Sequence, residues 1–362
     1  MSTIEATSIT KKFGSFTAIK DVDLHVAEGE VVCLLGPSGC GKTTTLRVIA
    51  GLESATSGEV RVAGRLMNNL SPQKRNIAMV FQFYALYPSV TIEENIAFPL
   101  YHEKCSATER HARVKQVAQI LQLEEVLDRL PGQVSEGEKQ RAAVARAIVR
   151  DPNCFLFDEP LSRLDVELRQ SMRGQIKEVL AGLSKATVIV THDQLEALTM
   201  AHRIAIMRDG EIEQIGTPHE VFSQPKNIFV AGFIGTPKMN LLHGNVSDIS
   251  RGKVSVKIGT QTMAIPMKPS DHINVGAKLT IGFRPRAVMP KNTSTKASVS
   301  AQVELIEPMG AETLVHLKDD VETEYRLVVK RSQKVLIGET VHFTCQPEQM
   351  HVFGEHGQAV RS

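Results

Sequence analysis

Three short apolar runs, each ending in glycine or polar residues, constrain the fold of this chain more than any other sequence feature. They are VVCLLG at residues 31–36, CFLFDE at 154–159 and TVIVTH at 187–192. Continuous apolar runs of this length are typical of parallel strands buried on both faces, with functional groups at their carboxyl ends. Helical patterns lie between the runs, so we expect an α/β domain.

The helical patterns predict where the sheet is interrupted. KTTTLRVIAGL directly follows the first run, and ATERHARVKQVAQILQL places Val114, Val117 and Leu121 on one helical face. EKQRAAVARAIVR repeats this pattern with Ala143 and Ala147. The segment from about residue 83 to 150 is too long for a simple connection between strands. We therefore expect an inserted, mostly helical subdomain there.

The sequence pattern changes after FVAGFIGTPKMN at residues 229–240. The segments that follow are short, alternate polar with apolar residues and end in turn formers: GKVSVKIG, TMAIPM, KLTIGFRP, ASVSAQVELIEP, TLVHLK and ETVHFTC. These are strand signals for a small all-β domain, a barrel or a sandwich. We expect one domain at residues 1–235 and a second at 236–362.

Bulk properties exclude several classes of protein. The net charge of +2 is too small to indicate a nucleic-acid binder, and no apolar run reaches the length of a membrane span. The five cysteines are odd in number and lack CxxC spacing, which favours reduced thiols over a disulfide framework or zinc site. We expect a soluble intracellular chain whose role at any membrane comes through a partner.

GPSGCGKT at residues 36–43 fits the phosphate-binding pattern G-x-x-x-x-G-K-[ST], between a predicted strand and a predicted helix. Glycines allow backbone N–H groups to surround a polyphosphate, and the helix N-terminus adds its positive dipole end. A glycine-rich turn that only connects strand to helix is the alternative, and the flanking elements argue against it. The residues expected at the nucleotide phosphates are Gly36, Ser38, Gly39, Cys40, Gly41, Lys42, Thr43 and Thr44.

Polar residues at the ends of the other two runs complete a candidate catalytic site. Asp158 can hold Mg²⁺ through water, and Glu159 can polarise an attacking water as general base. His192 stands where an imidazole can contact the γ-phosphate. Taken alone, adjacent carboxylates are as often solvated turn residues and a single histidine is more often structural. The phosphate loop favours the catalytic interpretation.

These residues resemble the nucleotide-binding subunit of an ATP-binding cassette (ABC) transporter, and the resemblance covers nearly the whole chain. It implies a P-loop NTPase: a RecA-like parallel sheet core with an antiparallel β subdomain and an inserted helical subdomain, then a small all-β OB-like domain. By position, residues 36–43 resemble the Walker A loop and residues 154–159 the Walker B strand. The resemblance adds the Q-loop Gln82, the adenine-stacking Phe13, the D-loop SRLD ending at Asp165, and Mg²⁺ ligands Thr43, Gln82 and Asp158.

Within this family, KRNIAMVFQFYALYP, NIFVAGFIGTPKMN and GFRPRAV are similar to ATPases of importers for maltose, multiple sugars and glycerol phosphate. The C-terminal domain then resembles a regulatory and dimerising domain, with Arg286 where an acid is common. The likeness implies a head-to-tail ATPase dimer, two membrane permease subunits and an external solute-binding protein, at the cytoplasmic face of the inner membrane. Residues 83–100 are the expected docking surface for the permeases. No nucleic-acid partner is implied.

VSEGEKQR at residues 134–141 aligns with the LSGGQ signature, which acts on the partner's ATP. Ser135 and Gly137 match, whereas Glu136 and Glu138 replace a glycine and a glutamine. Ser135 and Glu138 also form a capping-box pattern, a plain helix start. A carboxylate about 6 Å from a phosphate charge costs about 3 kcal/mol at an effective dielectric near 20. The altered signature therefore suggests pairing with a second, different ATPase.

Other classes of P-loop protein fit less well. A chromosome-organising ATPase needs a long coiled-coil insertion, translation-type factors usually join two cassettes, and a small-molecule kinase needs no signature segment. A catalytically weakened regulatory subunit is the alternative within the family, and Glu159 and His192 argue against it. The solute, whether a sugar, a polyol such as glycerol or glycerol phosphate, is selected by the membrane subunits and the binding protein.

Overall fold

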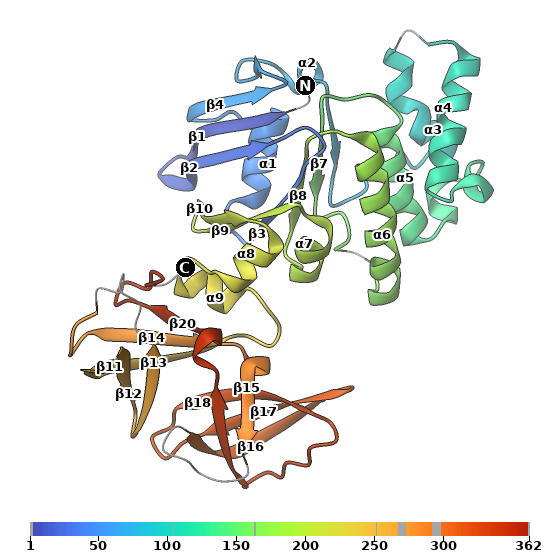
Figure 1. Cartoon of the computed structure of the whole chain (residues 1–362). Coiled ribbons are helices and arrows are strands. Elements are labelled where there is room, and N and C mark those ends of the chain that lie inside the picture. The colour runs from blue at the N-terminus through green and yellow to red at the C-terminus, as the bar shows by residue number, and fades with distance from the viewer. Residues whose placement is uncertain are drawn as a thin grey trace. The chain divides into compact units, whose positions relative to one another are not determined.

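A computed structural model describes residues 3–103, 105–162, 164–250, 252–266, 273–291 and 298–360. The chain divides into two compact units, Met1–Pro218 and His219–Ser362. Figure 1 shows helices and strands mixed in the first unit, while strands dominate the second. This division falls earlier in the chain than the boundary expected between residues 235 and 236, which stays a prediction.

A six-stranded sheet forms the centre of the first unit. Its order is β10 (Glu211–Gly216), β9 (Arg203–Arg208), β3 (Val31–Leu35), β8 (Thr187–Thr191), β7 (Cys154–Asp158) and β6 (Ile77–Val80). All neighbours pair in parallel except β10 with β9. The three apolar runs contain the adjacent strands β3, β8 and β7, and every residue of these strands is buried. The predicted parallel sheet is therefore confirmed.

The register of these strands brings their carboxyl ends to one edge. Leu35 of β3 pairs with Thr191 of β8, and Asp158 of β7 pairs with Val190. Val80, the last residue of β6, pairs with Phe157. Residues that follow these strand ends consequently meet at the same edge, whatever their separation in sequence.

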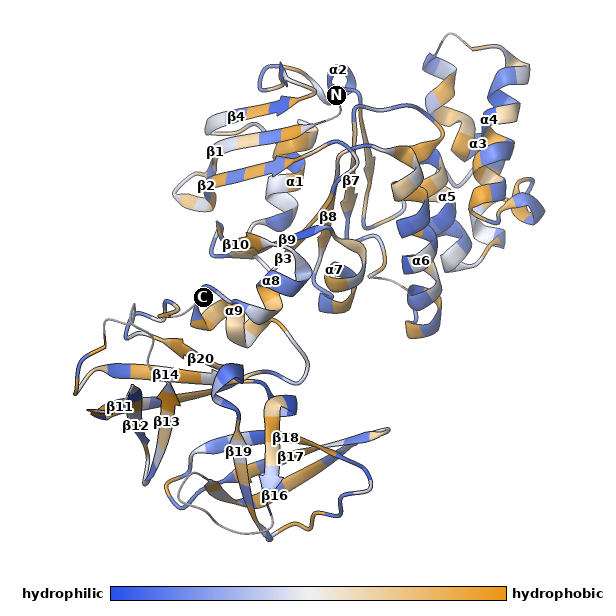
Figure 2. Cartoon of the chain, in the orientation of Figure 1, coloured by the Kyte–Doolittle hydropathy of each residue, from blue (hydrophilic) through white to orange (hydrophobic). Residues whose placement is uncertain are grey.

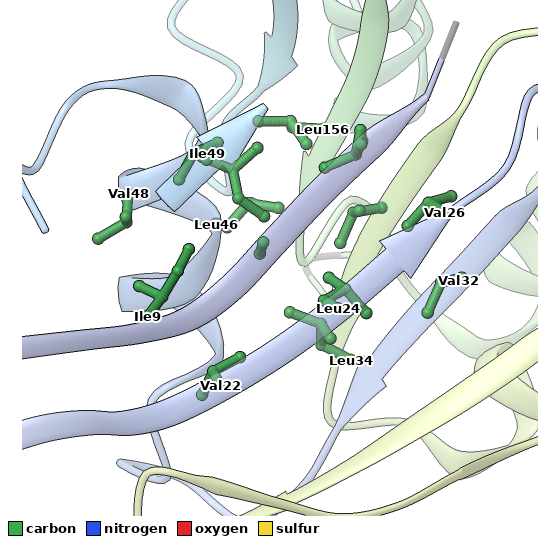
Figure 3. Packing of buried hydrophobic residues seen from close by; sticks show 14 of the residues in the cluster. Ile9, Val22, Leu24, Val26, Val32, Leu34, Leu46, Val48, Ile49 and Leu156 are labelled. Atoms are coloured by element: carbon green, nitrogen blue, oxygen red, sulfur yellow. The ribbon is translucent and has the colours of Figure 1, made fainter. Parts of the chain in front are cut away.

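An antiparallel sheet of four strands packs with the central sheet around α1 (Lys42–Ala50). Its order is β2 (Phe16–Val26), β1 (Ile4–Phe13), β4 (Ser57–Val62) and β5 (Arg65–Leu66). One apolar cluster includes Ile9 and Leu24 from this sheet, Leu46 from α1, and Leu34 and Leu156 from the central sheet (Figure 3). The helix that follows the phosphate loop is thus fixed between two sheets.

Helices are the only regular elements that the described residues between β6 and β7 form, as the length of this segment predicts. The elements are α3 (Ile92–Ala97), η1 (Phe98–His102), α4 (Ala107–Ile120), η2 (Glu124–Val126), η3 (Pro131–Gln133) and α5 (Glu136–Ile148). Val114, Val117 and Leu121 are buried, as their spacing predicts. The rest of the first unit comprises α2 (Pro72–Arg75), α6 (Val166–Leu183) and α7 (Gln194–Met200).

Hydropathy follows this arrangement. Figure 2 shows hydrophobic residues concentrated on the central strands β7 and β8, while α6 carries both hydrophobic and hydrophilic residues. Burial agrees, since α6 buries Met172, Ile176, Val179 and Leu180 and exposes most of its other residues. No helix among the described residues is long and apolar enough to cross a membrane.

The second unit contains α8 (Pro218–Ser223), whose first residue ends the first unit, and α9 (Ile228–Phe233), followed by two five-stranded antiparallel sheets. One sheet has the order β13 (Gln261–Pro266), β12 (Lys253–Ile258), β11 (Asn240–Ser250), β14 (Lys278–Phe283) and β20 (Met350–Phe353). The other has the order β15 (Val288–Lys291), β19 (Thr340–Cys345), β16 (Val299–Met309), β17 (Glu312–Lys318) and β18 (Glu324–Lys330). The all-β prediction is confirmed; residues 267 and 297, at the ends of two predicted strands, lie outside the described residues.

A buried arginine joins α1 to the start of β6. Arg75 is 3% exposed, and its guanidinium donates to the carbonyls of Val48 (2.9 Å), Ile49 (2.7 Å) and Leu70 (3.0 Å). Two of these carbonyls belong to the last turn of α1, where a cation also interacts favourably with the helix dipole. Burial lowers the pKa of Arg75. The contact fixes the helix behind the phosphate loop relative to the strand that leads to Gln82.

We expect Arg75→Lys to lower the free energy of unfolding by about 1–3 kcal/mol, because one ammonium cannot reach three carbonyls in a planar fork. Chemical denaturation of the full chain would measure this change. Arg61→Lys is the matched control, since Arg61 is half-exposed and, among the residues that the structure describes, pairs only with Glu59. Its effect should stay within about 0.5 kcal/mol. Equal losses in the two variants would contradict the assigned role of Arg75.

Candidate functional site

The phosphate loop leads from the end of β3 into α1 with little room for side chains. A Cβ atom on Gly36 would lie 2.3 Å from the carbonyl oxygen of Met207, and one on Gly41 would lie 2.7 Å from that of Ala18. Gly41, the N-cap of α1, also has a φ of 103°. Ser38 and Gly39 are exposed on the loop, and Thr44 lies in the first helical turn. The backbone N–H groups at this helix start form a cradle suited to an anion.

The Lys42 side chain folds back over this loop. Its ammonium donates to the carbonyls of Gly36 and Pro37, both at 2.8 Å, and only 6% of the residue is exposed. Among the described residues, no carboxylate lies within ion-pairing distance of the Lys42 ammonium. Cys40 is buried beside it, with Sγ 3.8 Å from Nζ, and burial raises the pKa of the thiol. An uncompensated cation at a helix N-terminus favours a polyphosphate ligand.

Thr43 and Asp158 bring two oxygen ligands together at the entrance of α1. The Thr43 hydroxyl donates to Asp158 Oδ1 at 3.0 Å. Burial raises the pKa of the Asp158 carboxyl, and the hydrogen bond from Thr43 opposes this shift. Hard divalent cations such as Mg²⁺ take oxygen ligands of this kind together with substrate phosphates. The donor set therefore fits Mg²⁺ beside the phosphate cradle.

Glu159 lies between two residues that the sequence separates widely. The Gln82 amide donates to Glu159 Oε2 at 2.9 Å, and His192 Nδ1 lies 3.3 Å from Oε1. Gln82 follows β6 and His192 follows β8, so the shared strand edge brings all three groups together. The side chain of Glu159 is 19% exposed and that of His192 is 55% exposed. A carboxylate positioned by an amide and an imidazole can accept a proton from a bound water.

The backbone of Glu159 adopts a conformation that is uncommon outside glycine. Its φ is +49°, in the left-handed region, where a non-glycine residue is strained. Three hydrogen bonds hold it there: its N–H donates to Val190 O (2.9 Å), and its carbonyl accepts from the N–H (3.3 Å) and hydroxyl (3.1 Å) of Ser162. Such strain persists only where surrounding contacts enforce it, and it is frequent at functional sites.

Two further residues expected at the site lie at the ends of other elements. Phe13 ends β1 and is 46% exposed, with the Lys11 ammonium 4.7 Å from its ring centroid. Asp165 is the N-cap of α6, where its carboxylate accepts from the N–H of Leu168 at 2.9 Å. Arg163, in the same expected D-loop, lies outside the described residues.

Residues 134–141, the expected signature segment, include the start of α5, which has the predicted capping box. Ser135 is the N-cap and accepts from the N–H of Glu138. The Glu138 carboxylate in turn accepts from the hydroxyl and the backbone N–H of Ser135, both at 2.7 Å, and these bonds lower its pKa. Glu136 is about half-exposed and pairs with Lys139 at 2.7 Å. Gly137 is buried, and a Cβ there would lie 2.5 Å from Leu168 Cδ2.

The sequence did not predict the hydrogen-bonded groups that hold the backbone on either side of His192. Thr191 and Glu196 are each 2% exposed, and the Thr191 hydroxyl donates to the Glu196 carboxylate at 2.6 Å. Asp193 caps α7, and its carboxylate lies 3.5 Å from the Arg169 guanidinium of α6. Glu196 is one polar residue of α7, and the sequence pattern around it gives no indication that its carboxyl is buried.

Relatives align with almost the whole chain. It is 44% identical over 318 residues to the sulfoquinovosyl glycerol transport ATP-binding protein SmoE of Agrobacterium fabrum, covering 87% of each chain. It is 40% identical over 364 residues to the maltose/maltodextrin import ATP-binding protein MalK of Yersinia pestis, covering 100% of this chain and 98% of MalK. It is 43% identical over 345 residues to the sn-glycerol-3-phosphate import ATP-binding protein UgpC of Vibrio vulnificus, covering 95% and 91%.

Family models and a solved structure agree with these relatives. The ABC transporter model matches residues 19–162, and the TOBE domain model matches residues 284–353. The dimeric ATP-binding cassette MJ0796, solved in a post-hydrolysis state with ADP and Pi, aligns with a TM-score of 0.54 at 33% identity. The alignment covers 59% of this chain and 98% of MJ0796. The chain therefore belongs to the ABC transporter family, as one of its ATP-hydrolysing subunits.

Proposed function

We propose that this chain powers the import of a carbohydrate-type solute, such as a sugar, a polyol or glycerol phosphate. Its relatives are named for the transport of sulfoquinovosyl glycerol, maltose/maltodextrin and sn-glycerol-3-phosphate. The observation that carries the catalytic part is the Glu159 carboxylate held between Gln82 and His192 beside the phosphate loop. Because the three named solutes differ, the relatives support the class of solute and not one compound.

In this proposal the phosphate loop holds the β- and γ-phosphates of ATP. The glycines at residues 36 and 41 allow the loop to pack where a Cβ would clash, Gly39 is exposed, and the buried Lys42 ammonium supplies the balancing charge. Binding would transfer the Lys42 donors from the carbonyls of Gly36 and Pro37 to phosphate oxygens, a stronger charge-assisted contact. Phe13 offers an exposed ring face for adenine, with Lys11 near the ring.

Thr43, Asp158 and Gln82 are the proposed Mg²⁺ ligands, Asp158 acting through a water. The hydrogen bond between Thr43 and Asp158 supports this, since it brings a hydroxyl and a carboxylate from different elements to one point. When bound, Mg²⁺ neutralises charge on the phosphate oxygens. The amide nitrogen of Gln82 already donates to Glu159, which leaves its amide oxygen as the atom suited to a cation.

Glu159 is the proposed general base, and His192 the residue that contacts the γ-phosphate. Gln82 and His192 each approach one oxygen of the Glu159 carboxylate, so its orientation is restricted before ATP arrives. Such pre-organisation lowers the cost of aligning base and water for attack on the γ-phosphate. The attacking water gives its proton to Glu159 as its oxygen bonds to the γ-phosphorus. The bond between that phosphorus and the oxygen bridging to the β-phosphate breaks, and the products are ADP and phosphate.

We expect Glu159→Gln to lower the turnover of ATP by about 10²–10⁴-fold, because an amide cannot accept the proton of the attacking water. The KM for ATP should change little, since the phosphate loop is intact. Phosphate release by the purified chain measures both quantities. Glu178→Gln, at an exposed site on α6, is the control and should retain wild-type turnover. Wild-type turnover in Glu159→Gln would exclude Glu159 as the base.

A groove in the first unit supports docking of the membrane permeases at residues 83–100. It has a volume of about 810 Å³, and its lining includes Phe81, Tyr87 and Phe98. The Tyr87 and Phe98 rings are 4.4 Å apart and each is about 40% exposed. Arg146 of α5 donates to the carbonyls of Ala85 and Tyr84, both at 2.7 Å, which ties the groove to the helix of the signature. Exposed aromatics around a groove suit a protein interface.

We assign the chain to the cytoplasmic face of the inner membrane, bound to two permeases that receive solute from an external binding protein. The C-terminal domain is proposed to hold an ATPase dimer together and to receive regulators. Arg286 there donates to both oxygens of Glu312 and to the carbonyl of Thr236 at 2.8 Å. An arginine bonded to Glu312 and Thr236 presents a regulator with a different charge from the acid that is common at this position.

The altered signature supports pairing with a second, different ATPase. Glu138 accepts the hydroxyl proton of Ser135, so this hydroxyl presents lone pairs where a partner's γ-phosphate needs a donor. Glu136 adds a second carboxylate at the same helix start, where it pairs with Lys139, while Glu138 interacts electrostatically with Arg141 and Arg129. A partner with an ordinary signature would complete the site of this chain. The reciprocal site would be the weaker one.

We expect the chain alone to hydrolyse ATP slowly, and Glu136→Gly to raise its turnover by about tenfold. The basis is that removing one carboxylate near a phosphate is worth about 1–3 kcal/mol, part of which Lys139 already screens. Glu125→Gln, which removes an exposed charge elsewhere in the helical segment, is the matched control and should change nothing. Full, cooperative turnover by the unmodified homodimer would rule out the proposed heterodimer. An unchanged rate in Glu136→Gly would mean that the carboxylate contributes only to the start of the helix and does not affect hydrolysis.

A further inference from the structure

The imidazole of His192 is exposed, so its direction depends on the backbone that carries it. The ring is 55% exposed, and its Nδ1 lies 3.3 Å from the Glu159 carboxylate. Because packing does not enclose the side chain, the two residues on either side of His192 set where it points. Thr191 ends β8 and Asp193 caps α7, so His192 lies in the turn between two regular elements.

One hydroxyl fixes both sides of this turn. The Thr191 hydroxyl donates its only proton to Glu196 at 2.6 Å and accepts the N–H of Asp193 at 3.0 Å. Glu196 reaches back to Thr191 from the first turn of α7, across the residue that carries the imidazole. The Asp193 carboxylate then accepts from the N–H of Leu195 and Glu196, which closes the turn onto the helix.

Burying a carboxylate at this point is unfavourable in itself. Glu196 is 2% exposed, and burial raises the pKa of its carboxyl. Arg169 is a nearby cation, but its ion pair at 3.5 Å is with Asp193. An apolar side chain of similar size would pack in the same place without the desolvation cost. The acid is therefore better explained by what its acceptor oxygen does to Thr191 than by packing.

We propose that Glu196 is a positioning residue for His192, acting through the Thr191 hydroxyl on the turn that aims the imidazole at Glu159. With the proton of Thr191 committed to Glu196, a lone pair of the same oxygen is available to the Asp193 N–H. Without Glu196, the Thr191 hydroxyl can rotate. The turn then loses the bond to Glu196, and the bond from the Asp193 N–H is no longer fixed in direction. The inference rests on the role proposed above for His192.

Two lesion variants and two conservative variants test this inference in the full chain. Thr191→Val and Glu196→Leu remove the donor or the acceptor at similar size, whereas Thr191→Ser and Glu196→Gln keep a hydroxyl or an acceptor oxygen. Thr187→Val is the matched control, because Thr187 is buried at the other end of β8 and its hydroxyl donates to a carbonyl. Glu196→Leu also relieves the buried charge, so it tests the inference if Thr191→Val does not fold.

The first measurement is ATP turnover. We expect the lesion variants to lower kcat by about tenfold with an unchanged KM, since one hydrogen bond of this kind changes a barrier by that order. The conservative variants and Thr187→Val should stay within about twofold of wild type. In a His192→Ala background, Thr191→Val should have no further effect. A further loss in that background, or the same loss in Thr187→Val, would overturn the inference.

The second measurement does not depend on turnover. In chain labelled at histidine, His192→Ala identifies the His192 ring resonance, and Glu159→Gln should shift that resonance in wild type because the two side chains are paired. In Thr191→Val and Glu196→Leu this response should be lost. A preserved response would overturn the positioning role of Glu196. Wild-type turnover in His192→Ala would instead refute the proposed role of His192, so the two failures are distinguishable.

Discussion

The parallel pairing of strands that are buried on both faces is the constraint on which the first unit depends. Inside β3, β7 and β8 no position can carry an exposed polar group, so polar residues are confined to the strand ends. The register aligns these ends to within about one residue, at a single edge of the sheet. A phosphate loop, a pair of acids and a histidine that are far apart in sequence therefore form one site as a consequence of the sheet.

Much of this arrangement could be predicted from the sequence, because the central strands can be recognised there as unbroken apolar runs. The positions of Lys42, Glu159 and His192 follow from where each run ends. The β-rich character of the second unit was also predicted, but its strands β11, β15, β18 and β20 were not. Strand β18 begins with charged and aromatic residues and lacks a clear alternation, and its register comes from pairing with β17, residue against residue.

What the sequence did not predict depends on tertiary burial. Arg75 and Glu196 read as ordinary polar residues of helices, yet both are nearly inaccessible to solvent. Their partners are groups distant in the chain or hidden by folding: the carbonyls that end α1 for one, and the Thr191 hydroxyl for the other. Periodicity identifies which residues face a core, but not which polar group will meet a buried donor or acceptor. The residues that support the site from buried positions, Arg75 and Glu196, could therefore be identified only from the structure.

The left-handed backbone of Glu159 links the chemistry of this chain to its tolerance of substitution. Glycine or asparagine would occupy that conformation more easily, by about 1–2 kcal/mol for glycine, but neither carries a carboxylate. If Glu159 has the proposed role of general base, a screen for thermal stability alone would favour substitutions at residue 159 that abolish turnover. The residue proposed as the general base is therefore one that a redesign for stability alone would favour replacing.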